Sequence, residues 1–276
     1  MRLEQLISEA LNEDVGQGDI TSEACLDQEQ TGTALIRAKQ ELVVCGHDVA
    51  KEVFRQMGTT YTPLVKEGVL IKATTPIASI QGKIAKMLTA ERVALNFLMR
   101  LCGIATHTYS VSSRLKGHLR LVDTRKTTPL LRQHERRAVR IGGGHNHRYA
   151  LYDGILIKEN HIKAAGSVSA AVQLAKQNAH HLLKIEIEVE SFEQLKEAAA
   201  AGADVVMLDN MSDQQLKEAV SFRNDFAPGL LLEASGNMTA DRAVVVEEIG
   251  VDIVSMGGLI HQATWADLSM KLTSVD

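Results

Sequence analysis

The sequence predicts an α/β protein, with a sandwich-like N-terminal α+β domain followed by a parallel α/β barrel. Two observations support this prediction. After residue 117, six short apolar runs alternate with segments of helical pattern, the order expected of parallel strands joined by helices. Before that point, helices and short strands follow one another without regular alternation. We place the domains at residues 1–112 and 113–276.

The N-terminal domain begins with an amphipathic helix, because apolar residues recur at helical spacing from Leu3 to Leu11. Turn residues then separate short apolar runs, which predicts a mixed α+β unit. We expect strands at 33–38, 41–45, 69–73 and 77–81 and a helix at 48–57.

A strongly apolar helix follows from Met87 to Leu101, and Cys102-Gly103 is expected to end it. Arg92, Asn96 and Arg100 lie along one side of this helix, since they are spaced by four residues. Unpaired charges on so apolar a helix would be expensive. The stripe therefore indicates either an internal salt bridge or a contact with a ligand or another subunit.

The second domain is predicted to be a barrel of six or seven strands. Its apolar runs occupy 118–126, 154–160, 183–190, 204–210, 230–237 and 252–258, and helical patterns occupy 168–178, 191–201, 213–223 and 239–249. Polar residues stand at the carboxyl ends of the strands, the edge at which a parallel barrel builds its site. An open sheet would bind only at its switch point, so six consecutive units with charged ends favour a barrel.

Positive charge is concentrated between residues 120 and 163. This stretch holds ten Lys and Arg against four Asp and Glu, in a chain whose formal net charge is −4. A basic cluster in an acidic protein is suited to a small polyanion better than to nucleic acid, which needs a wider basic surface. For Arg132, Arg136, Arg137 and Arg140, an ordinary solvated helix is the simpler interpretation.

Composition excludes several classes of function. Aromatic residues make up only 4% of the chain, which leaves little for base stacking. The three cysteines have no paired spacing, which favours a reducing, cytoplasmic location and core positions. The N-terminus does not resemble a secretory signal, and no segment has the roughly 20 apolar residues of a membrane span. Phosphate-loop, dinucleotide and zinc motifs are not found.

Two local patterns concern the basic stretch. Thr127-Thr128-Pro129 predicts a helix start next to Arg125 and Lys126, and a helix N-terminus accepts anions readily. Three glycines at 142–144 are expected to end that helix and to bring the backbone close to a ligand, or to form a plain connection.

A row of acids forms the third local pattern. Glu186, Glu188 and Glu190 alternate with apolar residues and so point to one face of their strand. This face must either be solvated or meet cations and a divalent ion. Asp209 and Ser235-Gly236 end later strands, where they could hold hydroxyls, Mg²⁺ or a phosphate.

These motifs together resemble the quinolinate phosphoribosyltransferase family. The resemblance is carried, in chain order, by EDVGQGDIT (13–21), ERVALNFLMRLCGIAT (91–106), DTRKTTP (123–129), GGGHNHR (142–148), LIKENH (156–161), EVE (188–190), MLDN (207–210), EASGN (233–237) and SMGGLIH (255–261). It runs almost from end to end. It implies an incomplete α/β barrel after an N-terminal domain, and a homodimer whose sites borrow residues from the neighbour, with further assembly left open.

The resemblance also implies a reaction and its residues. A phosphoribosyl group passes from phosphoribosyl pyrophosphate to quinolinate with decarboxylation, giving nicotinate mononucleotide for NAD synthesis. Quinolinate carboxylates are assigned to Arg125, His147, Arg148 and Lys158, with Arg92 from the partner subunit. Phosphoribosyl pyrophosphate and Mg²⁺ are assigned to Lys126, Glu186, Asp209, Ser235, Gly236, Gly257 and His261. The catalytic residues are Lys126, Lys158, Glu186 and Asp209, and the metal ligands are Glu186 and Asp209.

The chain departs from the family pattern at two positions. The family usually has Gly where this chain has Leu130, and Ser where it has Cys102. We expect Leu130 to fall within the first turn of a helix, where Leu is a better helix former than Gly.

Three other functions are compatible with parts of the pattern. A phosphoribosyltransferase acting on nicotinate would need one carboxylate clamp instead of two. An aldolase or decarboxylase could use Lys158 as a Schiff base. A non-catalytic anion-binding protein would not need the dense clustering of acids and bases.

Overall fold

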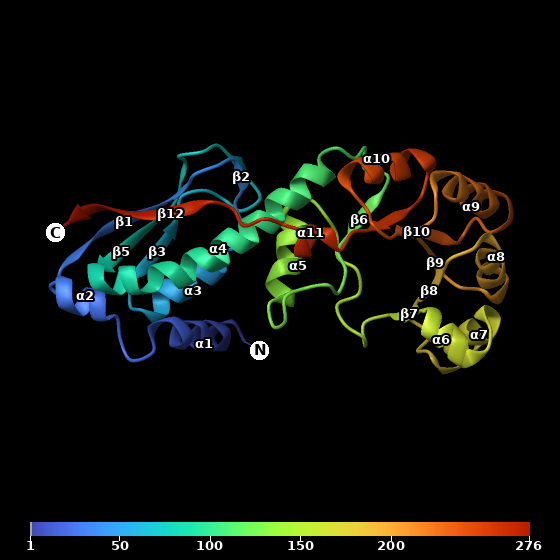
Figure 1. The fold of residues 1–276 in the computed structure, drawn as a ribbon, viewed down its shortest axis with the longest axis horizontal. Coiled ribbons are helices and arrows are strands. Elements are labelled where there is room, and N and C mark those ends of the chain that lie inside the picture. Colours follow the sequence, from blue (N-terminus) through green and yellow to red (C-terminus); the bar gives the residue numbers. More distant parts are fainter. Residues whose placement is uncertain (1) are drawn as a thin grey trace. The chain divides into compact units, whose positions relative to one another are not determined.

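The computed structural model describes residues 2–276 and divides the chain into two compact units (Figure 1). The first unit contains the residues up to Tyr109 with Thr128–Gly143 and Ala263–Asp276, and the second contains Ser110–Thr127 and Gly144–Gln262. The units interleave along the chain, whereas the predicted division at 112–113 makes the domains consecutive. One helix and the last strand, placed in the barrel by that division, group with the first unit.

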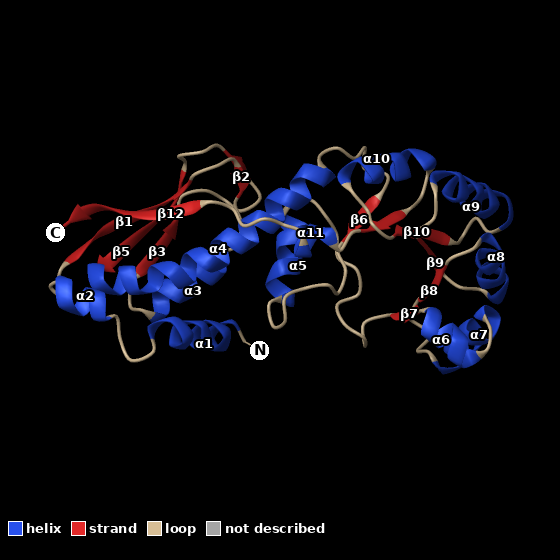
Figure 2. Ribbon diagram, in the orientation of Figure 1, coloured by secondary structure: helices blue, strands red, loops and turns tan. Residues whose placement is uncertain are grey.

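The first unit contains a four-stranded antiparallel sheet with helices along it (Figure 2). The strand order is β12 (Leu268–Val275), β1 (Thr31–Ala38), β5 (Pro76–Lys83) and β3 (Thr60–Pro63). Further elements of this unit are α1 (Leu3–Val15), α2 (Ile20–Cys25), α3 (His47–Gln56) and the paired strands β2 (Leu42–Val43) and β4 (Leu70–Ile71). The predicted α+β character is confirmed, but α2, β3 and β12 were not predicted.

The long helix α4 (Ile84–Ser112) continues through Cys102-Gly103, so the predicted helix end there is wrong. Gly103 serves close packing instead of a turn. A Cβ atom at this position would lie 2.0 Å from the carbonyl oxygen of Thr264. The backbone N–H of Ala266 also donates to the carbonyl of Met99, on the same helix (2.9 Å). Glycine at 103 therefore lets the C-terminal segment pass against α4.

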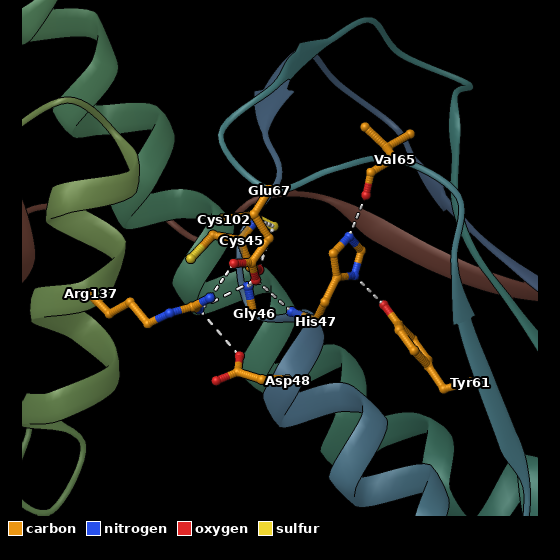
Figure 3. Close-up of polar contacts among 9 residues, drawn as sticks. All are labelled: Cys45, Gly46, His47, Asp48, Tyr61, Val65, Glu67, Cys102 and Arg137. Atoms are coloured by element: carbon orange, nitrogen blue, oxygen red, sulfur yellow. Dashed lines mark hydrogen bonds and ion pairs between the residues drawn. The ribbon is translucent and has the colours of Figure 1, made fainter.

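Cys102 is completely buried in this helix beside Cys45 (Figure 3). Its Sγ accepts from the backbone N–H of Cys45 (3.3 Å) and donates to the carbonyl of the same residue (3.2 Å). Burial raises the pKa of the Cys102 thiol to about 12, so it stays protonated and unreactive. The thiol thus makes the two contacts that a serine hydroxyl could make. Cys25, in contrast, is exposed, so its predicted core position is wrong.

Helix α5 (Arg132–Ile141) begins later than the Thr-Thr-Pro pattern predicts. Thr128 precedes the helix, and its backbone N–H and hydroxyl both donate to Glu135 (2.8 Å each). Leu130 has a left-handed backbone with φ of 67° and is 75% exposed. The expectation that Leu130 lies in a helical turn is therefore wrong. Glycine reaches this conformation without the steric penalty that a Cβ atom brings.

The second unit contains a six-stranded parallel sheet with helices on its outer side (Figure 2). The strand order is β6 (Arg120–Val122), β11 (Ile253–Ser255), β10 (Leu231–Ser235), β9 (Val205–Asp209), β8 (Ile185–Val189) and β7 (Ile155–Ile157). The helices are α6 (Glu159–Ala165), α7 (Val168–Asn178), α8 (Phe192–Ala201), α9 (Asp213–Phe226), α10 (Ala240–Ile249) and α11 (Gly258–His261). Because β6 and β7 are the edges of this sheet, the parallel α/β barrel is incomplete.

Helix starts in this unit follow from local sequence. Ser167, Ser191, Ser212 and Thr239 each accept a backbone N–H from the first turn of α7, α8, α9 and α10. Such caps satisfy donors that have no partner within the helix. The predicted positions of all six strands and these four helices are confirmed. Within residues 2–276, no helix combines the length and apolar character required to cross a membrane.

The segment leading into β6 is held by Glu247 of α10. Its carboxylate accepts backbone N–H groups from Lys116 (2.7 Å), His118 (3.0 Å) and Leu119 (3.3 Å). Burial alone would raise the pKa of Glu247, but these donors outweigh burial and lower the pKa. The carboxylate thus replaces backbone pairing where the strand has not yet begun.

We predict that Leu130→Gly raises the free energy of unfolding by about 0.5–1 kcal/mol. The left-handed conformation costs Leu roughly 1–2 kcal/mol, and the greater freedom of Gly in the unfolded chain takes back part of the gain. Urea denaturation measures the change. Leu130→Ala removes the same exposed side chain but keeps the strain, so a similar gain in that variant would contradict the explanation.

Glu247→Gln is predicted to lower the free energy of unfolding at pH 7 by about 1–2 kcal/mol. Because the folded-state pKa of Glu247 is lowered, its carboxylate stabilises the fold above the ordinary carboxyl pKa. This contribution is lost as pH falls through the folded-state pKa. The difference between variant and wild type should therefore shrink toward about pH 3. Glu248→Gln is the control, since its surface ion pair with Lys116 contributes little.

Candidate active site

Strand register brings the polar residues of the second unit together in rows. Glu188 of β8 stands beside Met207 of β9, which stands beside Glu233 of β10. Two residues further along, Asp209 stands beside Ser235. Residues two apart in a strand face the same side of the sheet. The carboxyl ends of the strands therefore present acids and hydroxyls on one face.

A cavity of about 790 Å³ opens on this face. Ten of the predicted site residues line it: Arg125, Lys126, His147, Arg148, Lys158, Asp209, Ser235, Gly236, Gly257 and His261. They come from the ends of strands and from the loops that follow them. The structure thus brings together residues that span well over a hundred positions of the sequence.

Two predicted site residues lie elsewhere. Glu186 is buried, with 8% of its surface exposed, and is not part of the cavity lining. Its neighbour two residues on, Glu188, lines the cavity in its place. Arg92 lies on α4 of the first unit, where it is exposed. Arg100 of the same stripe forms an ion pair with Glu135 (2.8 Å), so the predicted internal salt bridge is present there.

His147 is held between two buried acids. Its Nε2 lies 3.2 Å from a carboxylate oxygen of Glu186 and 3.5 Å from one of Glu233. Burial lowers the pKa of His147, but the hydrogen bonds and charges of the two acids outweigh it and raise the pKa to about 10. The backbone N–H of Arg148 lies 2.7 Å from Nδ1, on the other side of the ring. Nε2 is the nitrogen that faces the acids and donates to them.

The same two acids have unsatisfied oxygens. Glu186 Oε1, Glu233 Oε1 and Ser255 Oγ have no hydrogen-bond partner among residues 2–276. Burial and then the charge of Glu233 raise the pKa of Glu186, against the effect of His147. Among the residues that the structure describes, His147, Glu186 and Glu233 form a group that could hold a metal ion. One nitrogen or carboxylate oxygen from each residue lies within 4.8 Å of the other two. Asp209, predicted with Glu186 to bind metal, is not in this group.

Asp123, at the end of β6, orients the loop that carries His147. It is fully buried, accepts the backbone N–H of His147 (3.0 Å) and accepts the side-chain amide of Asn146 (2.5 Å). The backbone of His145 also pairs with that of Val122, which extends the sheet by one bridge. The three glycines before this loop therefore precede a fixed segment and not a flexible connection.

Cations line the side of the cavity near β7. Arg148 donates to the carbonyl of Gly154 (2.8 Å). Arg125 and Arg148 both line the cavity. Burial, and then the charge of Arg125, lowers the pKa of Arg148. Lys158 forms an ion pair with Glu188. Two neighbouring guanidinium groups favour binding of an anion that bridges them.

Glycine allows close approach at the ends of two other strands. Gly236 has φ of 95°, and a Cβ atom there would lie 2.2 Å from Oδ1 of Asn210. A Cβ atom at Gly257 would lie 3.0 Å from the side chain of Lys126 and 3.3 Å from Nε2 of His261. Both positions leave backbone exposed to the cavity between polar groups. A phosphate could reach these backbone groups without meeting a side chain.

Three residues of this arrangement were not predicted as site residues: Glu188, Glu233 and Asp123. All three stand at or near the carboxyl end of a strand, and Glu188 belongs to the acidic row of β8. The alternation in that row shows which residues share a face but not how deep each lies. Depth depends on the neighbouring strands, so Glu186 and Glu188 could not be separated from sequence.

Comparisons with known proteins agree with this geometry. The family models for the N-terminal and C-terminal domains of quinolinate phosphoribosyl transferase match residues 19–102 and 104–271. The probable nicotinate-nucleotide pyrophosphorylase (carboxylating) of Bacillus subtilis (strain 168) is 40% identical over 276 residues, covering 99% of this chain and 94% of that protein. The nicotinate-nucleotide pyrophosphorylase (carboxylating) of Mycobacterium leprae (strain TN) is 36% identical, covering 96% and 95%.

Solved structures show the same relationship. The crystal structure of NadC from Streptococcus pyogenes aligns with a TM-score of 0.94 at 38% identity, covering 99% of this chain and 97% of that one. The nicotinate-nucleotide pyrophosphorylase of Francisella tularensis aligns with a TM-score of 0.92 at 37% identity, covering 98% and 96%. Human nicotinic acid phosphoribosyltransferase shares the fold alone, with a TM-score of 0.68 at 12% identity. The chain belongs to the quinolinate phosphoribosyl transferase family.

Proposed function

We propose that this protein transfers a phosphoribosyl group from phosphoribosyl pyrophosphate to the ring nitrogen of quinolinate. The products are nicotinate mononucleotide, pyrophosphate and CO₂, and the reaction belongs to NAD biosynthesis. The observation that carries the proposal is a single cavity in which Arg125, Arg148 and Lys158 gather beside Glu188 and Asp209. Such a cavity suits a dicarboxylate together with a sugar that develops positive charge.

Quinolinate has two carboxylates, and the cavity offers cations for both. Arg125 and Arg148 present planar guanidinium groups that can bind a carboxylate in a bidentate manner. Lys158 adds a point charge from the end of β7. His147 adds positive charge, because the two acids raise its pKa to about 10. These four residues are the proposed quinolinate ligands.

Phosphoribosyl pyrophosphate is assigned to the adjoining part of the lining. The side chains of Lys126 and His261 both lie close to Gly257, and Gly236 directly follows Ser235, the last residue of β10. Backbone N–H groups at such turns bind phosphate oxygens without steric hindrance. Lys126 is proposed to stabilise the negative charge that grows on pyrophosphate as it departs.

Mg²⁺ is the proposed cofactor. Magnesium in phosphoryl sites is held by one or two carboxylates and by substrate oxygens, and Asp209 and Glu188 are carboxylates of the lining that fit this donor set. Mg²⁺ would neutralise pyrophosphate. Glu186, the other predicted ligand, is engaged by His147 beneath the lining, so Asp209 is the stronger of the two predicted ligands.

The chemistry needs no organic cofactor. The ring nitrogen forms a bond to the ribose carbon as the bond from that carbon to pyrophosphate breaks. The carboxylates of Glu188 and Asp209 favour the positive charge that develops on the ribose. The quaternary ring then accepts the electron pair left when the adjacent carboxylate departs as CO₂, and a proton replaces it on the carbon.

A homodimer is also proposed, with Arg92 of one subunit completing the site of the other. Arg92 is exposed on a helix whose neighbouring residues Val93, Ala94 and Leu95 are buried. A charged side chain held outward by so firmly packed a helix is suited to binding a ligand of another subunit. Cytoplasmic location stays a prediction from the sequence.

The alternative reactions have less support. A nicotinate-specific enzyme would need one carboxylate clamp, whereas Arg125, Arg148 and Lys158 supply more cation than one clamp requires. A Schiff-base lysine must be unprotonated, whereas Lys158 is paired with the carboxylate of Glu188. A plain anion-binding protein would not need acids in the cavity.

We predict that the protein with Mg²⁺ turns over quinolinate but not nicotinate, and that Arg148→Ala lowers kcat/KM for quinolinate about 10-fold to 100-fold. The reason is loss of a charge-assisted hydrogen bond of about 1.5–3 kcal/mol. Formation of mononucleotide measures the rate. Arg140→Ala, an exposed arginine of α5, is the matched control and should keep wild-type activity. Equal use of nicotinate would contradict the two-carboxylate clamp.

Arg92→Ala and Arg148→Ala are each predicted to keep no more than about a tenth of wild-type activity alone, yet to regain activity after the two are mixed, dissociated and reassembled. A mixed dimer has one site in which both arginines are intact, so about a quarter to a half of wild-type activity per dimer should return. Differently tagged subunits verify that mixed dimers have formed. Verified mixed dimers as inactive as the parents would show that Arg92 serves its own subunit.

A further inference from the structure

Helix α5 is attached within the first unit by two separate groups of charges. The first is drawn in Figure 3, where Arg137 forms ion pairs with Glu67 and with Asp48 (3.3 Å). Glu67 also accepts the backbone N–H groups of Gly46 (2.8 Å) and His47 (2.9 Å). This group ties α5 to the start of α3. None of its members belongs to the cavity lining or precedes a lining residue closely in sequence.

The second group centres on Glu135, which is completely buried. Arg100 donates to it through Nε (2.9 Å) and Nη2 (2.8 Å), and Thr128 donates its backbone N–H and its hydroxyl. Arg100 also donates to the carbonyl of Ala263 (3.2 Å). We call Glu135, Arg100, Thr128 and Ala263 the clasp. It joins three segments that are far apart in sequence.

Two of these segments lead directly into the lining of the cavity. Thr128 follows Arg125 and Lys126 by three and two residues, and Ala263 follows His261 by two. A residue that is hydrogen-bonded to a buried carboxylate restricts the conformations open to its close neighbours in the chain. The clasp therefore acts on the backbone of segments that carry three proposed anion ligands.

Asp123, which precedes segment 124–127, is held within the second unit. Asp123 is buried, and its backbone N–H donates to the carbonyl of His145 (3.2 Å). Within the segment, Lys126 donates its backbone N–H to the hydroxyl of Thr124 (3.1 Å). Four residues thus separate Asp123 from the hydrogen-bonded Thr128, and the side chains of Arg125 and Lys126 are exposed. Loss of the bonds at Thr128 would allow the residues just before it more conformations.

We propose that Glu135 and Arg100 are positioning residues, which hold segment 124–127 through Thr128 so that Arg125 and Lys126 are ordered before substrates bind. This proposal rests on the proposed function for its kinetic consequence. An ordered cationic segment binds anions better because the entropy of ordering is not lost on binding. Neither positioning residue needs to touch a substrate.

Thr128→Val tests the proposal, because it keeps the shape of the residue and removes only the hydroxyl that donates to Glu135. We expect KM for both substrates to rise about fivefold to tenfold, the effect of losing one hydrogen bond of ordinary strength. Limited trypsin digestion should cleave after Arg125 and Lys126 several times faster than in wild type, with fragment masses identifying the bonds. Thr128→Ser keeps a hydroxyl and should restore both values.

Glu67→Gln is the matched control, since it weakens the other attachment of α5 and leaves Thr128 intact. It should lower the melting temperature while KM and the trypsin cleavage rate stay at wild-type values. Wild-type KM and cleavage in Thr128→Val, or an equal change in Glu67→Gln, would overturn the proposal. If wild type does not use quinolinate, the proposed function fails, while the cleavage rates still decide whether the clasp orders the segment. If the Glu135→Gln variant folds, its KM and trypsin cleavage rate give a second comparison with wild type.

Discussion

Buried carboxylates are the constraint on which the structure of this protein depends. An ionised carboxylate in the interior costs several kcal/mol unless cations or N–H donors surround it. Glu135 meets Arg100 and Thr128, Asp123 meets the loop of His147, and Glu247 meets three backbone N–H groups. Each acid therefore decides the position of a segment that is neither helix nor strand. Removal of one partner would leave a charge that water cannot reach, so these contacts hold loops firmly.

In the candidate site, the charges of two buried carboxylates are only partly compensated. Glu186 and Glu233 share one histidine, and each keeps an oxygen without a partner among the described residues. At the rim, by contrast, Arg125 and Arg148 lie close enough for one to lower the pKa of the other. Negative charge gathered at Glu186 and Glu233, and positive charge gathered at Arg125 and Arg148, are both unfavourable in the free protein. A substrate with carboxylates, phosphates and a sugar that becomes positive relieves such an imbalance, which is the electrostatic basis of preorganised catalysis.

Prediction succeeded where the structure is local and periodic. In the second unit each strand follows from an apolar run, and each of four helices starts at a Ser or Thr that caps it. It failed where a distant segment replaces a local signal. Gly103 was predicted to end a helix, whereas glycine is required there because the backbone of Thr264 packs against it. Thr264 lies about 160 positions later in the sequence, so no local signal reveals this contact. Strand β12 was missed because its partner β1 lies near the other end of the sequence.

The sequence by itself determined the fold class, the six strands of the barrel, the ten cavity residues and the family, because these depend on hydrophobic period, capping residues and motifs that are contiguous in the chain. Only the tertiary structure decided which acids face the cavity and which lie beneath it. Glu186 and Glu188 share a face and a residue type, and they differ only in what neighbouring strands place around them. The same holds for Leu130, which has a left-handed backbone just before α5, although its own preference predicts a helical turn there.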